Sequence, residues 1–146
     1  MTSDGSDVPR IVVGFDGSAS AAKAVEWAAR QAELTGSVLD VVTAWEWPNT
    51  YGSPLPLPEG FDPRTDASSI AADAERIVRD THPSVHTRLV VMEGHAAPIL
   101  LDVSKGASLL VVGCRGHGEF LGMVIGSVSE HCVAHADCPV LVLRNA

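Results

Sequence analysis

The chain has little basic charge and no long apolar run. Its ten Lys and Arg residues are outnumbered by 18 Asp and Glu residues, the net charge is −8, and the basic residues are scattered singly. A nucleic-acid-binding protein needs a basic patch to attract the phosphate backbone, so DNA and RNA are poor candidates for a partner. No apolar run approaches the ~20 residues that span a bilayer, and we therefore expect no membrane-spanning segment.

Cysteine is also scarce. The three cysteines, Cys114, Cys132 and Cys138, are odd in number and lack the spacing of zinc ligands. Residues 1–9 contain no basic residue and no apolar stretch of signal-peptide length follows them, so we expect reduced thiols in a cytoplasmic protein. With 146 residues, 46% of them apolar, the chain suffices for one core. We predict a flexible tail over residues 1–9 and one domain over residues 10–146.

Short apolar runs alternate with segments of helical periodicity. The runs over residues 10–15, 37–44, 87–92, 108–113 and 139–143 predict strands. Apolar spacing predicts helices over residues 22–32, 66–80, 98–106 and 127–136. The stretch from Trp45 to Pro63 contains five prolines, which predicts an irregular loop and a candidate lid.

Strict alternation predicts an α/β fold: a single doubly wound, open parallel five-stranded sheet of order 3-2-1-4-5 with helices on both faces, as in Rossmann-like proteins. Ligands of such sheets bind at the carboxyl ends of the strands where the winding reverses, here between the first and fourth strands. Asp16 follows the first strand and Gly113 ends the fourth. We therefore expect both residues at a ligand site.

The segment from Gly113 to Ser127 holds five glycines between a buried strand and a helix start. Glycine lets backbone N–H groups approach an anion, and a helix N-terminus favours phosphate by roughly 0.3–1 kcal/mol per charge. The loop therefore suits phosphates. An alternative is that the glycines only turn the chain and that Ser127 caps its helix in a capping box with Glu130.

The loop is not that of a P-loop NTPase. It lacks the G-x-x-x-x-G-K-[ST] motif, and both lysines, Lys23 and Lys105, lie elsewhere. Arg115 is its one permanent cation.

The spacing of Gly113, Gly116, Gly126 and Ser127 is G-2x-G-9x-G-[ST], which resembles the signature of nucleotide-binding universal stress proteins. The similarity covers nearly the whole chain after the tail, in four blocks: Ile11–Ser18, Leu109–Gly116, Gly126–Ser129 and His135–Arg144. The resemblance implies the ATP-binding branch of that family and an adenine nucleotide α-hydrolase-like fold.

The resemblance also implies roles for individual residues. It places Asp16 near the ribose, although an Asp at this position also stabilises a turn. It places the backbone of Ala44 against adenine and Val112 and Gly113 on the ribose and base side, whereas later motif residues hold the phosphates. The predicted nucleotide site comprises Asp16, Gly17, Ser18, Ala44, Val112, Gly113, Arg115, Gly116, Gly126, Ser127, Val128 and Ser129.

Three residues depart from the family pattern: His117 and Glu119 in the loop, and Ser108 at the start of the fourth strand. Glu119 and Glu130 add negative charge beside a polyphosphate, which favours a ligand with fewer charges. Mg²⁺ would offset this charge, with Asp16 as an outer ligand, and we predict no metal site in the protein itself.

Several residues have a second, structural interpretation. His131 and His135 lie four apart on a helix, but no third metal ligand accompanies them, so we favour a solvated pair. An exposed Cys114 in the loop would suit a redox switch, but we favour a tolerated small residue. Trp45 and Trp47 either flank adenine or pack under the lid.

The last strand, Val140 to Leu143, is an apolar edge that needs a cover. The resemblance implies a homodimer through this strand, and an unknown protein partner is a further expectation. We predict a nucleotide-dependent stress-response or regulatory protein that binds ATP. The alternatives are a slow ATPase or phosphotransferase, a cyclic AMP-binding module, and a structural dimer with an empty site. Because Asp16 and Arg115 lack an accompanying lysine or base, we expect at most weak hydrolysis.

Overall fold

The computed structural model describes residues 8–47, 59–60, 62–114 and 125–144. Its strands are β1 (Arg10–Gly14), β2 (Val38–Trp45), β3 (Thr87–Glu93), β4 (Leu109–Gly113) and β5 (Val140–Leu143). Its helices are α1 (Ala19–Thr35), α2 (Pro63–Thr81), α3 (Ala96–Val103) and α4 (Ser127–His135). Each expected element is present in the expected order. Of the candidate lid from Trp45 to Pro63, residues 48–58 and 61 lie outside the described residues, so the lid stays a prediction.

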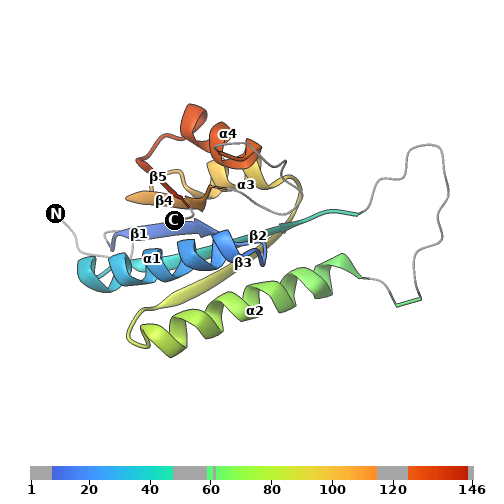
Figure 1. The fold of residues 1–146 in the computed structure, drawn as a ribbon, viewed down its shortest axis with the longest axis horizontal. Coiled ribbons are helices and arrows are strands. Elements are labelled where there is room, and N and C mark those ends of the chain that lie inside the picture. The colour runs from blue at the N-terminus through green and yellow to red at the C-terminus, as the bar shows by residue number, and fades with distance from the viewer. Residues whose placement is uncertain (1–7, 48–58, 61, 115–124, 145–146) are drawn as a thin grey trace.

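The strands form one parallel sheet of order β3-β2-β1-β4-β5, which confirms the predicted topology. In Figure 1, α1 and α2 cover one face of the sheet and α3 and α4 cover the other. The winding reverses between β1 and β4, where Val12 lies opposite Leu110. The carboxyl ends of these two strands are the expected position of a ligand.

Alternate residues of each strand enter two different cores. Ile11 and Val13 of β1 pack with the alanines of α1, whereas Val12 packs with Leu100 and Leu110 on the other face. This is why Ile11, Val12 and Val13 of β1 are all apolar: both faces of a parallel strand are covered by helices. Among the described residues, no helix combines the length and the apolarity needed to cross a membrane.

The boundaries of the expected proline-rich loop were wrong at both ends. Trp45 is the last residue of β2, and Pro63 is the first residue of α2. Proline suits that position because its missing N–H has no partner in the first turn of a helix. Asp62 caps α2, accepting hydrogen bonds from Arg64 N at 3.0 Å and Thr65 Oγ1 at 3.0 Å. The Thr65 hydrogen bond lowers the pKa of the Asp62 carboxyl.

A charge cluster surrounds the buried Asp40 near the amino-terminal ends of β1, β2 and β3. Asp40 is 4% exposed and accepts from Arg88 Nε at 2.6 Å and from Arg10 Nη1 at 3.3 Å. The same hydrogen bonding raises the pKa of Arg88. Arg10 also donates to the carbonyl of Val103, so the cluster links β1, β2 and β3 to the end of α3. We assign it a structural role.

Candidate functional site

The turn after β1 is a tight, hydrogen-bonded unit. Asp16 is half-buried, and its Oδ1 accepts from Ser18 N at 2.9 Å. Gly17 has a φ of 85°, a left-handed conformation that favours glycine. Ser18 then caps α1, because its Oγ accepts from Ala21 N at 3.2 Å. Asp16 therefore has the turn-stabilising role considered from the sequence, and its contact with a ribose stays a prediction.

The first turn of α4 is attached directly to the end of β4. Gly126 N donates to Cys114 O at 2.5 Å, and the Ser129 hydroxyl donates to Gly113 O. Cys114 N in turn donates to Leu143 O of β5 at 2.9 Å. These bonds fix the N-terminus of α4 at the carboxyl edge of the sheet, beside β1 and β4, the two strands between which the winding reverses.

The N-cap of α4 is Gly126, not Ser127, and no side chain caps the helix. The capping-box alternative was therefore wrong: Ser127 is already the first helical residue. The helical hydrogen-bond ladder begins with Glu130 N donating to Gly126 O at 2.9 Å. The N–H groups of Ser127, Val128 and Ser129 precede that ladder, and such groups at a helix N-terminus attract anions.

Gly113 serves helix–strand packing. A Cβ at this position would lie 2.5 Å from Ser20 Oγ and 3.0 Å from the Ser20 carbonyl carbon. Only glycine lets the start of α1 approach the end of β4 this closely. Val112 is 3% exposed, and Val128 packs against the same core. Both side chains therefore contribute to core packing.

Ala44 lies at the carboxyl end of β2, beyond the last residue of β1. Phe15 N donates to Val42 O on the β1 side, and Gly94 N donates to Trp45 O on the β3 side. Because backbone groups alternate in direction along a strand, those of Ala44 face the β1 side. β1 has already ended at Gly14, which pairs with Val42, so these groups lie beyond the carboxyl end of β1.

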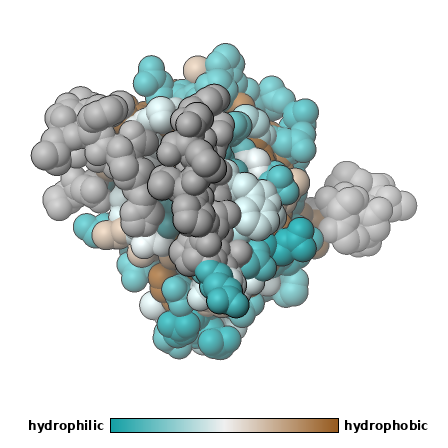
Figure 2. Space-filling model, turned by 90° about the vertical axis from the view of Figure 1, so that its right-hand side faces the viewer, coloured by the Kyte–Doolittle hydropathy of each residue, from teal (hydrophilic) through white to brown (hydrophobic). Residues whose placement is uncertain are grey.

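Three residues that the sequence did not single out, Arg64, Glu46 and His95, also lie at this edge, near Trp45 and Trp47. Arg64 of α2 is 5.5 Å from the centroid of the Trp45 ring, and Trp45 contacts Trp47 edge to face. Glu46 pairs with Nδ1 of His95 at 2.9 Å, and both are exposed. Figure 2 views this side of the molecule, where the described side chains around the rim are mostly hydrophilic.

The cysteines and histidines contribute no metal site within the described ranges, where no group of three potential ligands occurs. The rings of His131 and His135 lie 4.5 Å apart between centroids, and both residues are exposed. Cys114 is buried, contrary to the exposed position that a redox switch would need. Its sulfur lies 3.9 Å from Ser20 Oγ.

The fold thus brings together three groups of predicted residues: the turn Asp16–Ser18, the end of β4 at Val112–Gly113, and Gly126–Ser129. Ala44 lies on the neighbouring strand at the same edge. Arg115 and Gly116 lie outside the described residues, as do His117 and Glu119.

Comparison with known proteins agrees with this architecture. Residues 8–144 match the model of the universal stress protein family. The chain is 37% identical over 150 residues to the universal stress protein Rv2623 of Mycobacterium tuberculosis, covering 98% of this chain and 50% of Rv2623. The chain therefore spans about half the length of this curated relative.

Solved structures share the fold. A universal stress protein in complex with cAMP superposes with a TM-score of 0.72 at 23% identity, over 95% of this chain and 98% of its own. The universal stress protein from Archaeoglobus fulgidus in complex with dAMP has a TM-score of 0.68 at 21% identity, over 92% and 96%. With the family model matched from residue 8 to residue 144, the chain belongs to the universal stress protein family.

Proposed function

We propose that this chain binds an adenine nucleotide at the carboxyl ends of β1 and β4, and that ATP is its ligand. The observation that carries the proposal is the attachment of the α4 N-terminus to the end of β4, through Gly126 N to Cys114 O and Ser129 Oγ to Gly113 O. The cAMP and dAMP complexes of proteins with this fold support adenine as the base.

The phosphates lie at the start of α4. The N–H groups of Ser127, Val128 and Ser129 supply the donors, and Gly126 has no Cβ to obstruct the approach. The Ser129 hydroxyl is already donated to Gly113 O, so Ser129 contributes through its N–H. Gly116 and Arg115 complete the phosphate contacts. Mg²⁺ arrives with ATP, and Asp16 acts as its outer ligand.

The base and ribose lie toward β2. The backbone of Ala44 lies beyond the carboxyl end of β1 and meets adenine, while Asp16 lies at the ribose and the chain at Val112–Gly113 forms the remaining wall. Glu130 in the first turns of α4 places a negative charge near the phosphates, which favours AMP or cyclic AMP as the second candidate ligand.

We further propose a regulatory role in the stress response, in which nucleotide occupancy alters the protein's surface for a partner. Hydrolysis is weak at most, because the proposed site contains no lysine and no evident general base. The protein is cytoplasmic and pairs into a homodimer through the open edge of β5. Its domain comprises residues 10–146, with residues 1–9 as a tail.

Two substitutions at Gly126 test the phosphate position. Gly126 has φ −74° and ψ 166°, nearly the conformation of the N-cap Ser18 at −74° and 159°, so the backbone accepts either Ser or Asp. Both residues are good N-caps and should preserve α4, and because both cap oxygens compete with the phosphate for the same N–H groups, the difference between the two variants isolates the effect of charge. Only Asp adds a negative charge, which repels a phosphate about 4 Å away by roughly 1–4 kcal/mol, depending on exposure.

We expect Gly126→Asp to weaken ATP binding by roughly tenfold or more, while Gly126→Ser has a much smaller effect. Isothermal titration calorimetry measures the affinities, and thermal denaturation verifies that both variants fold. Equal ATP affinity of the folded Asp variant and the parent would show that the phosphates do not lie at α4.

A further inference from the structure

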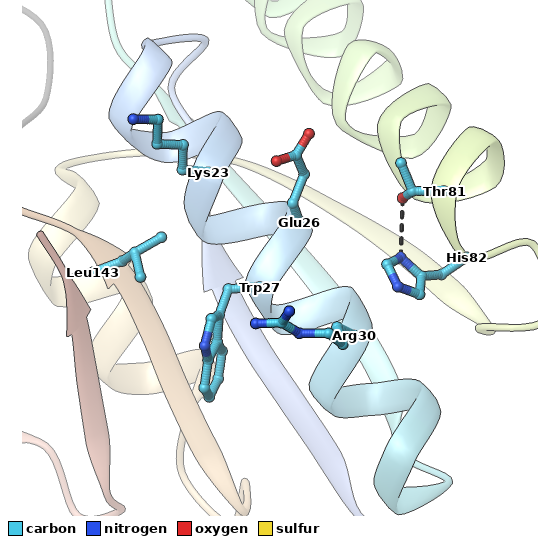
Figure 3. Close-up of a pocket in the computed structure, with 7 residues that line it drawn as sticks. All are labelled: Lys23, Glu26, Trp27, Arg30, Thr81, His82 and Leu143. Carbon is cyan, nitrogen blue, oxygen red and sulfur yellow. Dashed lines mark hydrogen bonds between the residues drawn. The ribbon is translucent and has the colours of Figure 1, made fainter. Parts of the chain in front are cut away.

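A concave surface lies on the outer face of α1, away from the nucleotide site proposed above. This α1 groove has a volume of about 380 Å³. Its lining residues come from α1, from the end of α2 and from β5: Lys23, Glu26, Trp27, Arg30, Thr81, His82 and Leu143. Figure 3 shows Trp27 and Leu143 on one side of α1, with Thr81 and His82 on the other. The indole and Leu143 also pack against the core, which fixes the floor of the groove.

Most of the described cations of this acidic chain contact a carboxylate or an aromatic ring, but three do not. Six described cations are held by a carboxylate or an aromatic ring: Arg10, Arg64, Arg76, Arg79, Arg88 and Lys105. Within the described ranges, Lys23, Arg30 and Arg144 form no ion pair or ring contact. Two of these three line the α1 groove, and the third directly follows Leu143. Two of the three described cations that have no ion pair therefore lie in one groove, together with a single lining carboxylate, Glu26.

The spacing along α1 sets how the groove recognises a ligand. Lys23, Trp27 and Arg30 occupy positions i, i+4 and i+7, so they share one helix face. The two cations are about 10 Å apart along the helix axis, with the indole between them. In Figure 3 the Arg30 guanidinium extends toward Trp27, whereas the Glu26 carboxylate points away from the indole.

We propose that the α1 groove is a docking site for an acidic segment of a partner protein. Carboxylates of that segment pair with Lys23 and Arg30, and an apolar side chain rests on Trp27. Charge complementarity favours this partner, because the two lining cations, Lys23 and Arg30, have no ion pair among the described residues and outnumber the one lining carboxylate, Glu26. The cations that line the groove are exposed, which suits an extended segment better than an enclosed small ligand. The proposal does not depend on nucleotide binding.

The test uses the full chain and a labelled peptide of alternating Glu and Leu, seven residues long, with the same peptide carrying Gln in place of Glu as a reference. Fluorescence anisotropy measures binding to the parent and to the Lys23→Gln/Arg30→Gln variant. Arg76→Gln/Lys105→Gln is the matched control, because it removes the same charge from exposed pairs outside the groove. All four positions are exposed, so both variants should fold.

We expect the Glu peptide to bind the parent and the control alike, and to bind the groove variant at least about threefold more weakly. Binding should weaken as salt rises from about 0.05 M to about 0.5 M, since screening shortens the reach of exposed charges. The proposal is overturned if the Glu peptide does not bind, if the Gln peptide binds equally, or if both variants lose the same affinity. Displacement of the peptide by ATP would assign the groove to nucleotide, and a change in oligomeric state in the groove variant alone would assign it to a second copy.

Discussion

Replacing Gly113 by Ala should destabilise the fold, because the added methyl group has no room. Its Cβ would lie 2.5 Å from Ser20 Oγ, and 3.0 Å and 3.1 Å from the carbonyl carbon and oxygen of the same residue. Ordinary contacts between carbon atoms are about 3.5–4.0 Å, so α1 must move by roughly half an ångström. Rotation of the Ser20 side chain can relieve the contact with Oγ, but the contacts with the Ser20 carbonyl group are relieved only if the helix backbone moves. Overpacking of this kind costs about 1–3 kcal/mol, and we expect the upper part of that range.

Gly14→Ala is a matched control on the neighbouring strand. Its Cβ would meet only the ends of the Leu100 side chain, at 3.1 Å and 3.3 Å, and that side chain can turn aside. Both substitutions reduce the freedom of the unfolded chain equally, so this contribution cancels in the comparison. Urea denaturation should show Gly113→Ala to be the less stable variant by about 1–2 kcal/mol. Equal stabilities would refute the inference that Gly113 is required for α1–β4 packing.

A Ser20→Ala background separates the two parts of the clash. Removing Oγ relieves the 2.5 Å contact and leaves the contacts with the Ser20 backbone. Gly113→Ala should therefore remain destabilising in that background, but by less than in the parent. Full rescue would assign the whole effect to the hydroxyl.

Two further predictions concern buried titratable groups. Asp40→Asn should destabilise the protein by about 1–3 kcal/mol in chemical denaturation, because it removes the charge that Arg10 and Arg88 share, and a loss below about 0.5 kcal/mol would contradict the structural role. Burial raises the pKa of Cys132 from 9.0 to about 11, so the folded chain holds this proton more tightly than the unfolded chain. Stability should therefore fall as pH rises from about 9 to about 11, and Cys132→Ala should remove that part of the slope. An unchanged slope in the variant would exclude Cys132 as its source.

Much of the fold was predictable because its signals are local. Gly36 ends α1 with a φ of 68°, as its position after the last apolar residue of the helix predicts. Residues 11–13 of β1 and 109–112 of β4 are all apolar because these strands are covered on both faces. Once strands and helices alternate strictly, few topologies remain, and the order β3-β2-β1-β4-β5 follows from them.

The parts of the site that could not be predicted depend on contacts between distant segments. The approach of Ser20 to Gly113 joins residues that are far apart in sequence, and so does the burial of Cys114 beneath α1. Ser127 resembled an N-cap because Glu130 follows three residues later. In the structure the N-cap is Gly126, whose N–H donates to the carbonyl of the distant Cys114, and Ser127 is the first helical residue. The concentration of free positive charge beside Trp27 emerges only when the ion pairs are known.

Residue-resolved amide NMR of the nucleotide-stripped protein, titrated with ATP, tests the central proposal most directly. If ATP binds as proposed, the largest shifts belong to the amides of Gly17, Ala44, Ser127 and Val128, and the amides around Trp27 change little. The absence of shifts at α4, or shifts confined to the α1 groove, would contradict a nucleotide site at the carboxyl ends of β1 and β4.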